Sequence, residues 1–141
     1  MQALKDDPSL LPSATEEFIR LVGPFQMVQR IATRDLDFKG KALKQGQLVL
    51  AHLGAGNRDP EAFERPDELD IKRNPNRHLG FGHGVHACLG APFARSEVPI
   101  VLELFLRRIP IYQIEPIQSE FPHRSLRGPK KLPIVFPPNQ A

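Results

Sequence analysis

The sequence contains a single cysteine, Cys88, and this scarcity limits the chemistry open to it. Without a second cysteine the chain cannot form an internal disulfide, so it lacks the framework that small proteins of oxidising compartments use. A reducing cytoplasm is the default setting for such a chain. We therefore expect a cytoplasmic protein whose one thiol is free to react or to bind a metal.

Long apolar runs and a secretory leader are also missing. Even the apolar stretch at residues 100–109 is broken by Glu103 and two arginines, whereas a helix that spans a membrane needs about 20 apolar residues. Met1 is followed by "QALKDDPSL", which has no basic start and no apolar segment. The sequence predicts neither a membrane span nor a signal peptide.

The excess of basic charge is mild. The 141 residues carry a formal net charge of +3, and no basic stripe interleaved with aromatic side chains is present. This pattern indicates a solvated surface and no nucleic-acid partner. With 40% hydrophobic and 25% charged residues, the chain suits one globular unit or a piece of a larger one.

The first half of the chain predicts one short helix and a small antiparallel sheet. Ser13 followed by Glu16 has the spacing of a capping box, which predicts a helix over residues 14–22. Strand-like runs at residues 26–32 and 47–53 are separated by the glycines and charged residues typical of turns. Fifteen prolines and ten glycines indicate that much of the remaining backbone is irregular.

The second half predicts a meander, a core helix and a hairpin. Residues 57–78 have neither a helical nor a strand period, so we expect an irregular meander. A long helix follows over residues 89–108. Its apolar stripe comprises Ala94, Val98, Val101, Leu102, Phe105 and Ile109. Runs at residues 111–118 and 130–136, around a polar turn at residues 125–130, predict a two-stranded hairpin and complete an α+β fold.

The stretch richest in chemistry is "HLGFGHGVHACLGAPFAR" at residues 78–95, which holds the cysteine between glycines and a helix. One interpretation is a zinc site. Its ligands would be His78, His83, His86 and Cys88. Structural zinc sites, however, usually take two clustered pairs of ligands from separated segments, and these four residues share one loop.

Other interpretations give the cysteine a different role. Cys88 could be a nucleophile with His86 as its base, although no third, orienting group is in evidence. Gly82, Gly84 and Ala87 match the G-x-G-x-x-A pattern of dinucleotide loops. The strand that should precede such a loop is replaced by "NPNRHL", so we set this interpretation aside. Cys88 could also be a buried structural cysteine beside a glycine turn.

A haem ligand accounts for more of these residues together. As a thiolate bound to haem iron, Cys88 would stand just before the helix, whose N-terminal dipole and unpaired amides favour a negative sulfur. Pro92 suits the first turn of that helix, because its missing N–H costs little there. The glycines let the backbone lie close to a flat macrocycle, and Phe81 could shield the sulfur from water.

These residues also carry a resemblance to a known family. Residues 81–90, "FGHGVHACLG", resemble the haem loop F-G-x-G-x-H-x-C-x-G of the cytochrome P450 monooxygenases. The sequence around this loop is most similar to the soluble bacterial members of that family. Glu17 and Arg20 resemble the E-x-x-R of that family. Residues 63–73 resemble the stretch that ends in a second arginine, Arg73. The resemblance covers nearly all of the chain.

The resemblance implies that Cys88 is the proximal ligand of haem b, an iron protoporphyrin. Arg30 and His86 would bind the haem propionates, and Ala94 is small enough to let the porphyrin approach the helix. Further haem contacts implied by the motif are Phe81, Gly82 and Gly90. A buried charged network behind the loop would comprise Glu17, Arg20 and Arg73.

The resemblance further implies a monooxygenase that activates oxygen and hydroxylates a small, apolar substrate. Residues 24–28 and the turn at residues 125–130 would contact that substrate. A ferredoxin-type electron donor would dock on the cysteine side, near Arg77, His83 or Arg95.

Members of the family are much longer than this chain, so the resemblance implies a C-terminal third only. Residues 1–141 would then form one haem-binding portion without the oxygen-activating helix. We expect this piece to be catalytically incompetent alone and to need the N-terminal portion or self-association. The alternative is an inactive remnant or interaction domain that keeps the motif without haem.

Overall fold

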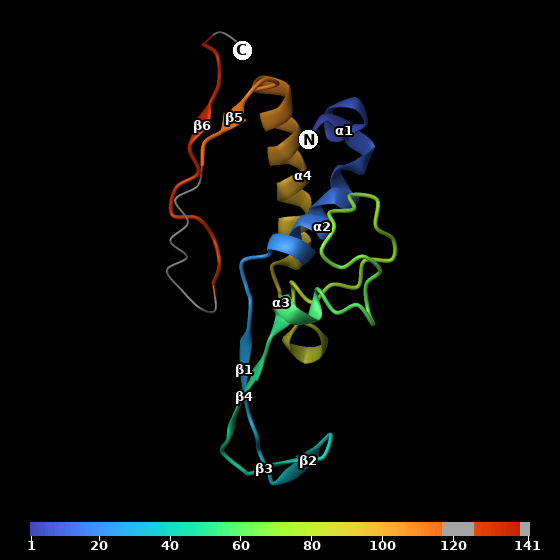
Figure 1. Ribbon diagram of the computed structural model, residues 1–141, viewed down its shortest axis with the longest axis vertical. Coiled ribbons are helices and arrows are strands. Elements are labelled where there is room, and N and C mark those ends of the chain that lie inside the picture. The colour runs from blue at the N-terminus through green and yellow to red at the C-terminus, as the bar shows by residue number, and fades with distance from the viewer. Residues whose placement is uncertain (117–125, 139–141) are drawn as a thin grey trace.

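The computed structural model describes residues 1–116 and 126–138, and it has an α+β fold with small antiparallel sheets (Figure 1). The helices are α1 (Gln2–Asp6), α2 (Leu11–Val22), α3 (Leu53–Gly56) and α4 (Ala91–Arg108), with short 3-10 helices at Pro8–Leu10 and Gly84–His86. The strands are β1 (Val28–Ile31), β2 (Leu36–Phe38), β3 (Lys41–Leu43), β4 (Leu48–Ala51), β5 (Gln113–Ile114) and β6 (Ile134–Val135). The α+β class expected from the sequence is confirmed.

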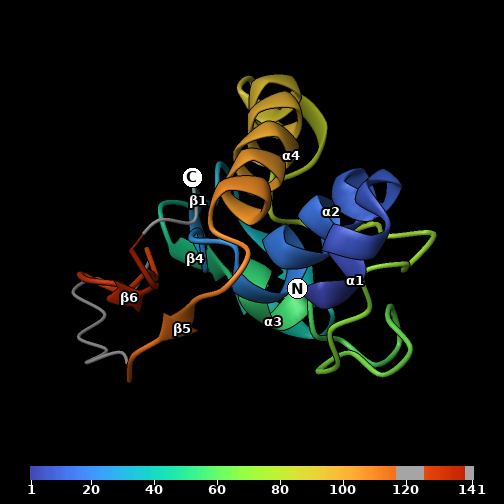
Figure 2. The ribbon, with the colours of Figure 1, turned by 90° about the horizontal axis from the view of Figure 1, so that it is seen from above.

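The two longest helices, α2 and α4, lie side by side and support the rest of the structure (Figures 1 and 2). Leu11 and Ala14 of α2 form one buried cluster with Leu106 of α4, and Leu4 of α1 belongs to the same cluster. Burying such a leucine side chain contributes about 1.5–3 kcal/mol. This small core fixes the direction of α4 and hence the position of the loop before it.

Helix α2 begins at Leu11, earlier than the capping box at Ser13 predicts. Pro12 occupies the first turn, where a missing N–H is tolerated. The Ser13 hydroxyl donates to the Ile71 carbonyl, 2.7 Å away, and makes no cap. The capping-box prediction is wrong because Glu16 bonds instead to the side chains of His78 and Arg95, which belong to other segments.

The predicted antiparallel sheet forms from the two expected runs. Strand β1 pairs with β4, with Val28 opposite Ala51 and Ile31 opposite Leu48, and the chain between them folds into the β2–β3 hairpin. The ribbon extends away from the helices (Figure 1), and Ile31 and Leu48 are 65% and 57% exposed. Arg30 therefore lies on an open ribbon.

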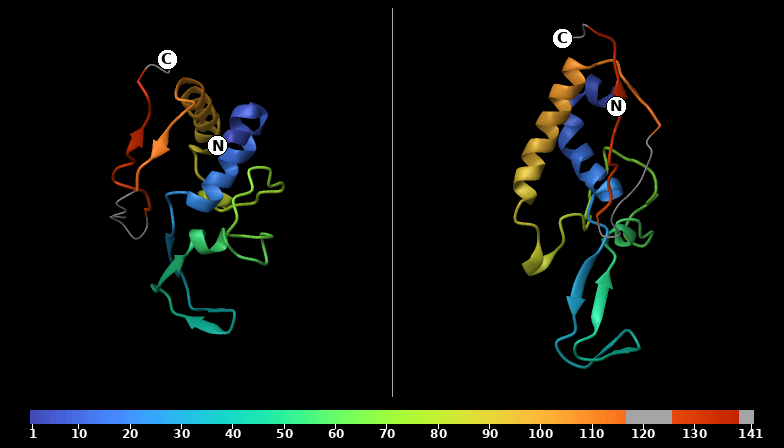
Figure 3. Two further views of the ribbon diagram at one scale, coloured as in Figure 1. Left: turned by 45° about the horizontal axis from the view of Figure 1, so that its top comes forward. Right: turned by 90° about the vertical axis from the view of Figure 1, so that its left-hand side faces the viewer.

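The meander at residues 57–78 contains neither helix nor strand and lies beside α2 (Figure 3). Turn hydrogen bonds give it local order; the Phe63 amide, for example, donates to the Asp59 carbonyl over 2.9 Å. Phe63 is only 5% exposed and anchors the segment. The meander thus returns to the helix instead of leaving the fold.

Helix α4 is apolar on more than the side that α2 covers. Val98 and Leu102 of the predicted stripe are partly buried, whereas Val101 is 55% exposed. The assignment of Val101 to the buried stripe is wrong, because α2 packs on one face of α4 and Val101 lies on another. Ile100, which is 56% exposed, shares that open side. In the part of the chain described, no helix has both the length and the apolar character needed to cross a bilayer.

The end of the chain forms a short hairpin. Strand β5 pairs antiparallel with β6, with Gln113 opposite Val135 and Ile114 opposite Ile134. The predicted turn at residues 125–130 begins outside the described residues. Its remaining part lies beside the segment that precedes β1, because Leu126 forms an isolated β-bridge with Phe25.

Candidate functional site

The cysteine loop runs from Phe81 to Gly90 and is closed by its own backbone. The Cys88 amide donates to the Phe81 carbonyl over 2.7 Å. A second bond, of 3.0 Å, runs from the Ala87 amide to the Gly84 carbonyl. These bonds hold Phe81 and Cys88 together at the base of the loop, so the motif is a folded element with a defined geometry.

Two glycines make the turn of this loop, and a third stands apart. Gly82 and Gly84 have φ values of +70° and +69°, in the left-handed region that side chains rarely adopt. A Cβ at Gly82 would also lie 3.3 Å from the His86 carbonyl oxygen. Gly90 has a φ of −82°, and a Cβ there would meet only the Cys88 Sγ at 3.9 Å, an ordinary contact. The described residues thus require glycine at 82 and 84 but not at 90.

The Cys88 thiol is exposed beside the first turn of α4. The backbone carbonyl of Cys88 accepts a hydrogen bond from the Ala91 amide over 3.2 Å, which ties the cysteine to the helix. An apolar rim adjoins it in the chain: Val85 and Leu89 are 96% and 98% exposed, and Phe93 is 71% exposed. Exposed apolar side chains that gather into one patch mark a binding surface.

The histidines of the loop do not gather around the cysteine as zinc ligands. Among residues 1–116 and 126–138, no three His, Cys, Asp or Glu side chains are grouped so that they could hold one metal ion. The His78 side chain is 1% exposed and bonds to Glu16, whereas Cys88 is exposed. The geometry therefore gives no support to the zinc interpretation.

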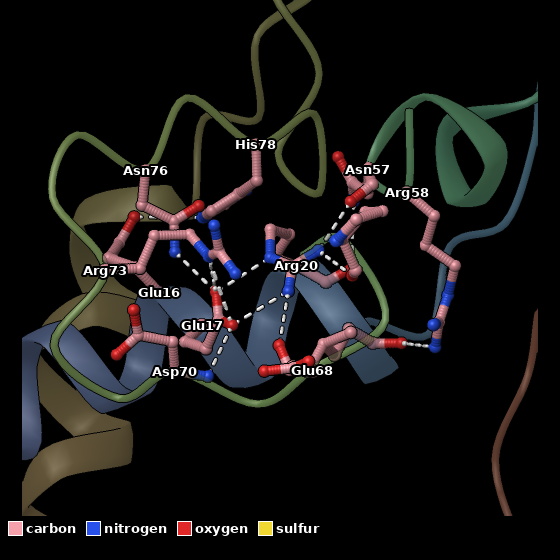
Figure 4. A network of polar contacts seen from close by, with 12 residues as sticks. Glu16, Glu17, Arg20, Asn57, Arg58, Glu68, Asp70, Arg73, Asn76 and His78 are labelled. Carbon is pink, nitrogen blue, oxygen red and sulfur yellow. Dashed lines mark hydrogen bonds and ion pairs between the residues drawn. The ribbon is translucent and has the colours of Figure 1, made fainter. Parts of the chain in front are cut away.

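Glu17 and Arg20 form a buried ion pair on α2 (Figure 4). Arg20 Nε and Nη2 donate to the two Glu17 carboxylate oxygens over 2.7 and 2.8 Å, and neither side chain is exposed. Arg73, from the meander, donates its Nε to the same carboxylate over 3.2 Å. The three residues that the sequence associates thus lie together in the structure.

The Glu17 carboxylate has further donors. The Asp70 amide and the Asn76 side-chain nitrogen donate to it over 2.9 and 3.0 Å. Burial by itself raises the pKa of the Glu17 carboxyl, but the hydrogen bonds from Arg20 and Asp70 outweigh burial and hold its pKa below the usual value. The carboxylate is therefore charged and satisfied, which is the condition under which a buried ion is tolerated.

Asn57 and Phe63 complete this network, and Asn57 is not among the site residues predicted from the sequence. Arg20 Nη1 donates to the Asn57 carbonyl over 2.7 Å, and its guanidinium lies 5.1 Å from the centre of the Phe63 ring. The buried Asn57 side chain accepts from the Leu79 amide over 2.6 Å. Asn57 therefore links α2 to the segment that enters the cysteine loop. A lone asparagine in "GNRDP" carries no signal of this role.

A second polar cluster lies on a neighbouring side of α2. Arg95 of α4 donates its Nε and Nη2 to the two Glu16 carboxylate oxygens over 2.8 and 2.9 Å. His78 Nε2 lies 3.0 Å from Glu16 Oε2. Because His78 Nδ1 accepts from the Gly80 amide over 3.1 Å, the proton of the neutral imidazole is on Nε2 and points at the carboxylate. The roles predicted for these side chains from the sequence were different: a capping box for Glu16, a zinc ligand for His78 and a docking contact for Arg95.

The surroundings in this second cluster shift the pKa values of Glu16 and His78. The hydrogen bond from Arg95 lowers the pKa of the Glu16 carboxyl, against the opposing effect of burial. Burial lowers the pKa of His78, and this outweighs the hydrogen bond to Glu16. At neutral pH the cluster therefore comprises a carboxylate, a neutral imidazole and a guanidinium.

The two residues implied as propionate partners are both exposed. Arg30 lies on β1, where its Nη1 donates to the Gln29 carbonyl over 2.7 Å. His86 ends the 3-10 helix within the loop. Ala94 is partly buried in the first turns of α4, with its amide bonded to the Gly90 carbonyl over 3.0 Å. Arg30 and His86 are thus accessible to a ligand, although the structure does not bring them into contact with each other.

The two segments implied to contact a substrate lie against each other. The Arg127 amide donates to the Pro24 carbonyl over 2.7 Å, next to the bridge between Phe25 and Leu126. Phe25 and Leu126 are 53% and 41% exposed. Two parts of the chain that are far apart in sequence therefore form one apolar wall.

Comparison with known proteins places the chain in a family. The sequence profile described as "Cytochrome P450" matches residues 5–140. The chain therefore belongs to the cytochrome P450 family, whose members bind haem.

Relatives and solved structures agree with this assignment. The chain is 44% identical over 138 residues to cytochrome P450 CYP107DY1 of Priestia megaterium, covering 96% of this chain and 34% of that protein. It is 41% identical over 134 residues to the biotin biosynthesis cytochrome P450 of Bacillus subtilis, covering 94% and 34%. The structure of P450BioI with an acyl carrier protein ligated to hexadec-9Z-enoic acid matches with a TM-score of 0.92 and 40% identity, covering 96% of this chain and 36% of that chain. The chain thus spans about a third of the length of these relatives.

Proposed function

We propose that this chain forms the sulfur side of the haem site in a monooxygenase that hydroxylates a small, apolar substrate. The observation that carries the proposal is the exposed Cys88 thiol, which a folded loop holds at the start of α4 beside the apolar rim. In this proposal Cys88 is the iron ligand, and the cofactor is haem b.

The residues around Cys88 fit a flat macrocycle. The packing of the described residues does not require a glycine at position 90. A porphyrin lying against the loop would require one, because a side chain there would hold it away from the backbone. The porphyrin would also cover the apolar rim, and removing apolar surface from water contributes about 25 cal/mol for each Å². Gly82 and the small Ala94 complete the surface that would face the ring.

Arg30 and His86 would hold the propionates. Each offers a polar hydrogen to a carboxylate, and a bond of this kind to a charged group contributes about 1.5–3 kcal/mol. Their exposure leaves both side chains able to turn toward a ligand. This assignment depends on that of Cys88, because an isolated exposed arginine is usually only solvated.

The chain's own residues would bind and orient the haem and shield the sulfur from water. The haem would supply oxygen activation when it is bound. Cys88 would hold the iron as a thiolate, and the backbone amides at the start of α4 favour that negative charge. Phe81, at the base of the loop, would keep water from the sulfur. Glu17, Arg20 and Arg73 would hold the meander against α2 and touch no reacting atom.

Substrate and electron donor would use separate surfaces. The apolar wall of Phe25 and Leu126 favours an apolar substrate, and one related structure holds a sixteen-carbon acyl group on its carrier protein. A ferredoxin-type donor carries negative charge and would dock through Arg77, His83 or Arg95 on the cysteine side.

The described residues offer only one face to a macrocycle, so we propose that residues 1–141 work in the cytoplasm as one haem-binding portion of a larger assembly. The remainder of that assembly would be the two thirds of the relatives that this chain does not span, or a second copy. A second candidate function is an interaction domain without haem. The exposed Ile100 and Val101 on α4 favour it, since they form an apolar face of their own.

Absorption spectroscopy of the purified chain after addition of haem separates these two functions. The haem proposal predicts a coloured protein whose reduced form, with carbon monoxide, shows the band characteristic of thiolate ligation. A folded protein that stays colourless and takes up no haem would support the interaction domain and overturn the proposal.

A further inference from the structure

We propose that Glu16, His78 and Arg95 form a latch that positions the cysteine loop by holding Phe81. This inference rests on the proposed function only for the identity of the group that Cys88 binds. The three side chains come from three segments: Glu16 from α2, Arg95 from α4, and His78 from the chain that enters the loop. A contact among them therefore fixes the loop relative to both long helices.

The carboxylate of Glu16 is the centre of the latch. Arg95 approaches it with two parallel N–H groups, over 2.8 and 2.9 Å, and such a bidentate pair fixes direction as well as distance. His78 Nε2 donates to the same carboxylate over 3.0 Å. Figure 4 shows Glu16 and His78 close together beside the Glu17 network.

His78 carries this restraint into the backbone. Its Nδ1 accepts the Gly80 amide over 3.1 Å, so both ring nitrogens are engaged and the imidazole cannot turn without breaking a bond. Gly80 itself lies against α2, where a Cβ would come within 2.4 Å of the Ile19 Cγ2. The residue before Phe81 is thus fixed from two directions.

Phe81 connects the latch to the cysteine. Its ring centre lies 5.8 Å from that of His78, and the Arg95 guanidinium lies 4.7 Å from it. Its carbonyl accepts the Cys88 amide over 2.7 Å. Glu16, His78 and Arg95 are therefore positioning residues, which act on Cys88 through Phe81.

The latch is distinct from the Glu17 network, although the two carboxylates are adjacent in sequence. Glu17 faces the meander, where the Asp70 amide donates to it, whereas Glu16 faces the loop and α4. Removing the Glu16 carboxylate should therefore lower the protection of amides in the loop, whereas removing the Glu17 carboxylate should lower that of amides in the meander.

Amide hydrogen exchange in the full haem-free chain tests the latch. Glu16→Gln should lower the protection of the Cys88 and Gly80 amides about tenfold, while the Asp70 amide keeps its protection. Glu97→Gln, which removes an exposed carboxylate from α4, should change none of them. A uniform loss of protection across all three amides, or no loss at Cys88, would overturn the proposal.

Variants of Arg95 and Phe81 keep the test decisive if Glu16→Gln prevents folding. Arg95→Lys keeps the charge without the bidentate geometry, so it should lower Cys88 protection by less than Arg95→Met does. In a Phe81→Leu background, Arg95→Met should have no further effect on the Cys88 amide; an undiminished effect there would contradict action through the ring. None of these measurements uses haem. The proposal of the latch can therefore fail while that of the thiolate ligand stands, and the thiolate proposal can fail while the latch stands.

Discussion

At the residue scale, Gly82 sets the path of the cysteine loop. Its φ of +70° is costly for any side chain, and its Cβ position lies 3.3 Å from a carbonyl oxygen. Gly82→Ala should therefore lower the free energy of unfolding by about 1–2 kcal/mol, measured by urea denaturation. Gly128→Ala is the control, because a Cβ there meets nothing within 4 Å. Equal effects of the two substitutions would contradict this account.

Arg30 is expected to contribute to haem retention. If it binds a propionate, Arg30→Ala should weaken haem retention about tenfold, since one charge-assisted bond contributes about 1.5–3 kcal/mol. The rate of haem transfer to apomyoglobin measures this retention. Arg34→Ala removes a nearby exposed arginine and should leave the rate unchanged. A rate for Arg30→Ala equal to that of the unmodified chain would remove Arg30 from the site.

His78 predicts a pH dependence of stability. Burial lowers its pKa in the folded chain, with Glu16 opposing this effect and Arg95 and Arg20 adding to it. Below the ordinary value of 6.5 the unfolded chain therefore binds more protons than the folded chain. This contribution is fully present above 6.5 and is lost as the pH falls toward the lowered pKa.

Urea unfolding between about pH 7 and pH 5 measures that loss. The carboxyl groups of Glu16 and Glu17 have lowered pKa values, so their contribution is lost only at more acidic pH. The unmodified chain should lose stability across this window, and His78→Gln should flatten the slope. A slope unchanged by the substitution would show that His78 does not titrate in this way.

At the element scale, the Glu17 network ties the meander to α2. Removing its central charge leaves Arg20 and Arg73 without their carboxylate partner in a buried site. Glu17→Gln should therefore cost about 3–5 kcal/mol of unfolding free energy. Glu97→Gln on the exposed side of α4 should stay within about 0.5 kcal/mol. Similar values for both would mean that the network contributes little to stability.

The elements that could be predicted from sequence are those with local signals. The strand-like runs that form β1 and β4 and the aperiodic meander follow from short-range patterns. Cys88 and its glycine loop were found because a specific motif occupies consecutive residues. Glu17 and Arg20 were found through the resemblance to the E-x-x-R of the family, because their spacing alone indicates no more than an exposed pair on one helical turn.

The elements that escaped prediction depend on contacts between distant segments. Ser13 satisfies local capping rules, yet its hydroxyl bonds to Ile71 in the meander. Glu16 lies far in sequence from its partners His78 and Arg95. Val101 has a core-like side chain, but its exposure depends on which face of α4 meets α2. Local propensity contains none of this information.

At the scale of the whole molecule, the chain presents a large open apolar surface. Val85, Leu89 and Phe93 beside the cysteine, and Ile100 and Val101 along α4, are all more than half exposed. Surfaces of this kind mark an interface. The chain also spans about a third of the length of its relatives, and the assembly that we propose would cover this surface with further protein.

This incomplete enclosure predicts poor catalysis by the chain alone. A haem covered on its sulfur face only would have its other face in water, where activated oxygen is lost before it reaches a substrate. Residues 1–141 with haem, a ferredoxin system and a panel of apolar substrates should therefore yield almost no product for each reducing equivalent consumed. Efficient coupling by the monomeric chain would contradict this expectation.

The ligand assignment of Cys88 is the central claim, and the carbon monoxide spectrum of the reduced, haem-loaded chain tests it most directly. Cys88→Ser should abolish the band characteristic of thiolate ligation, and Cys88→His should replace it with that of a nitrogen ligand. His83→Ala, an exposed loop histidine, should keep the thiolate band. Persistence of that band in the serine variant would contradict the account.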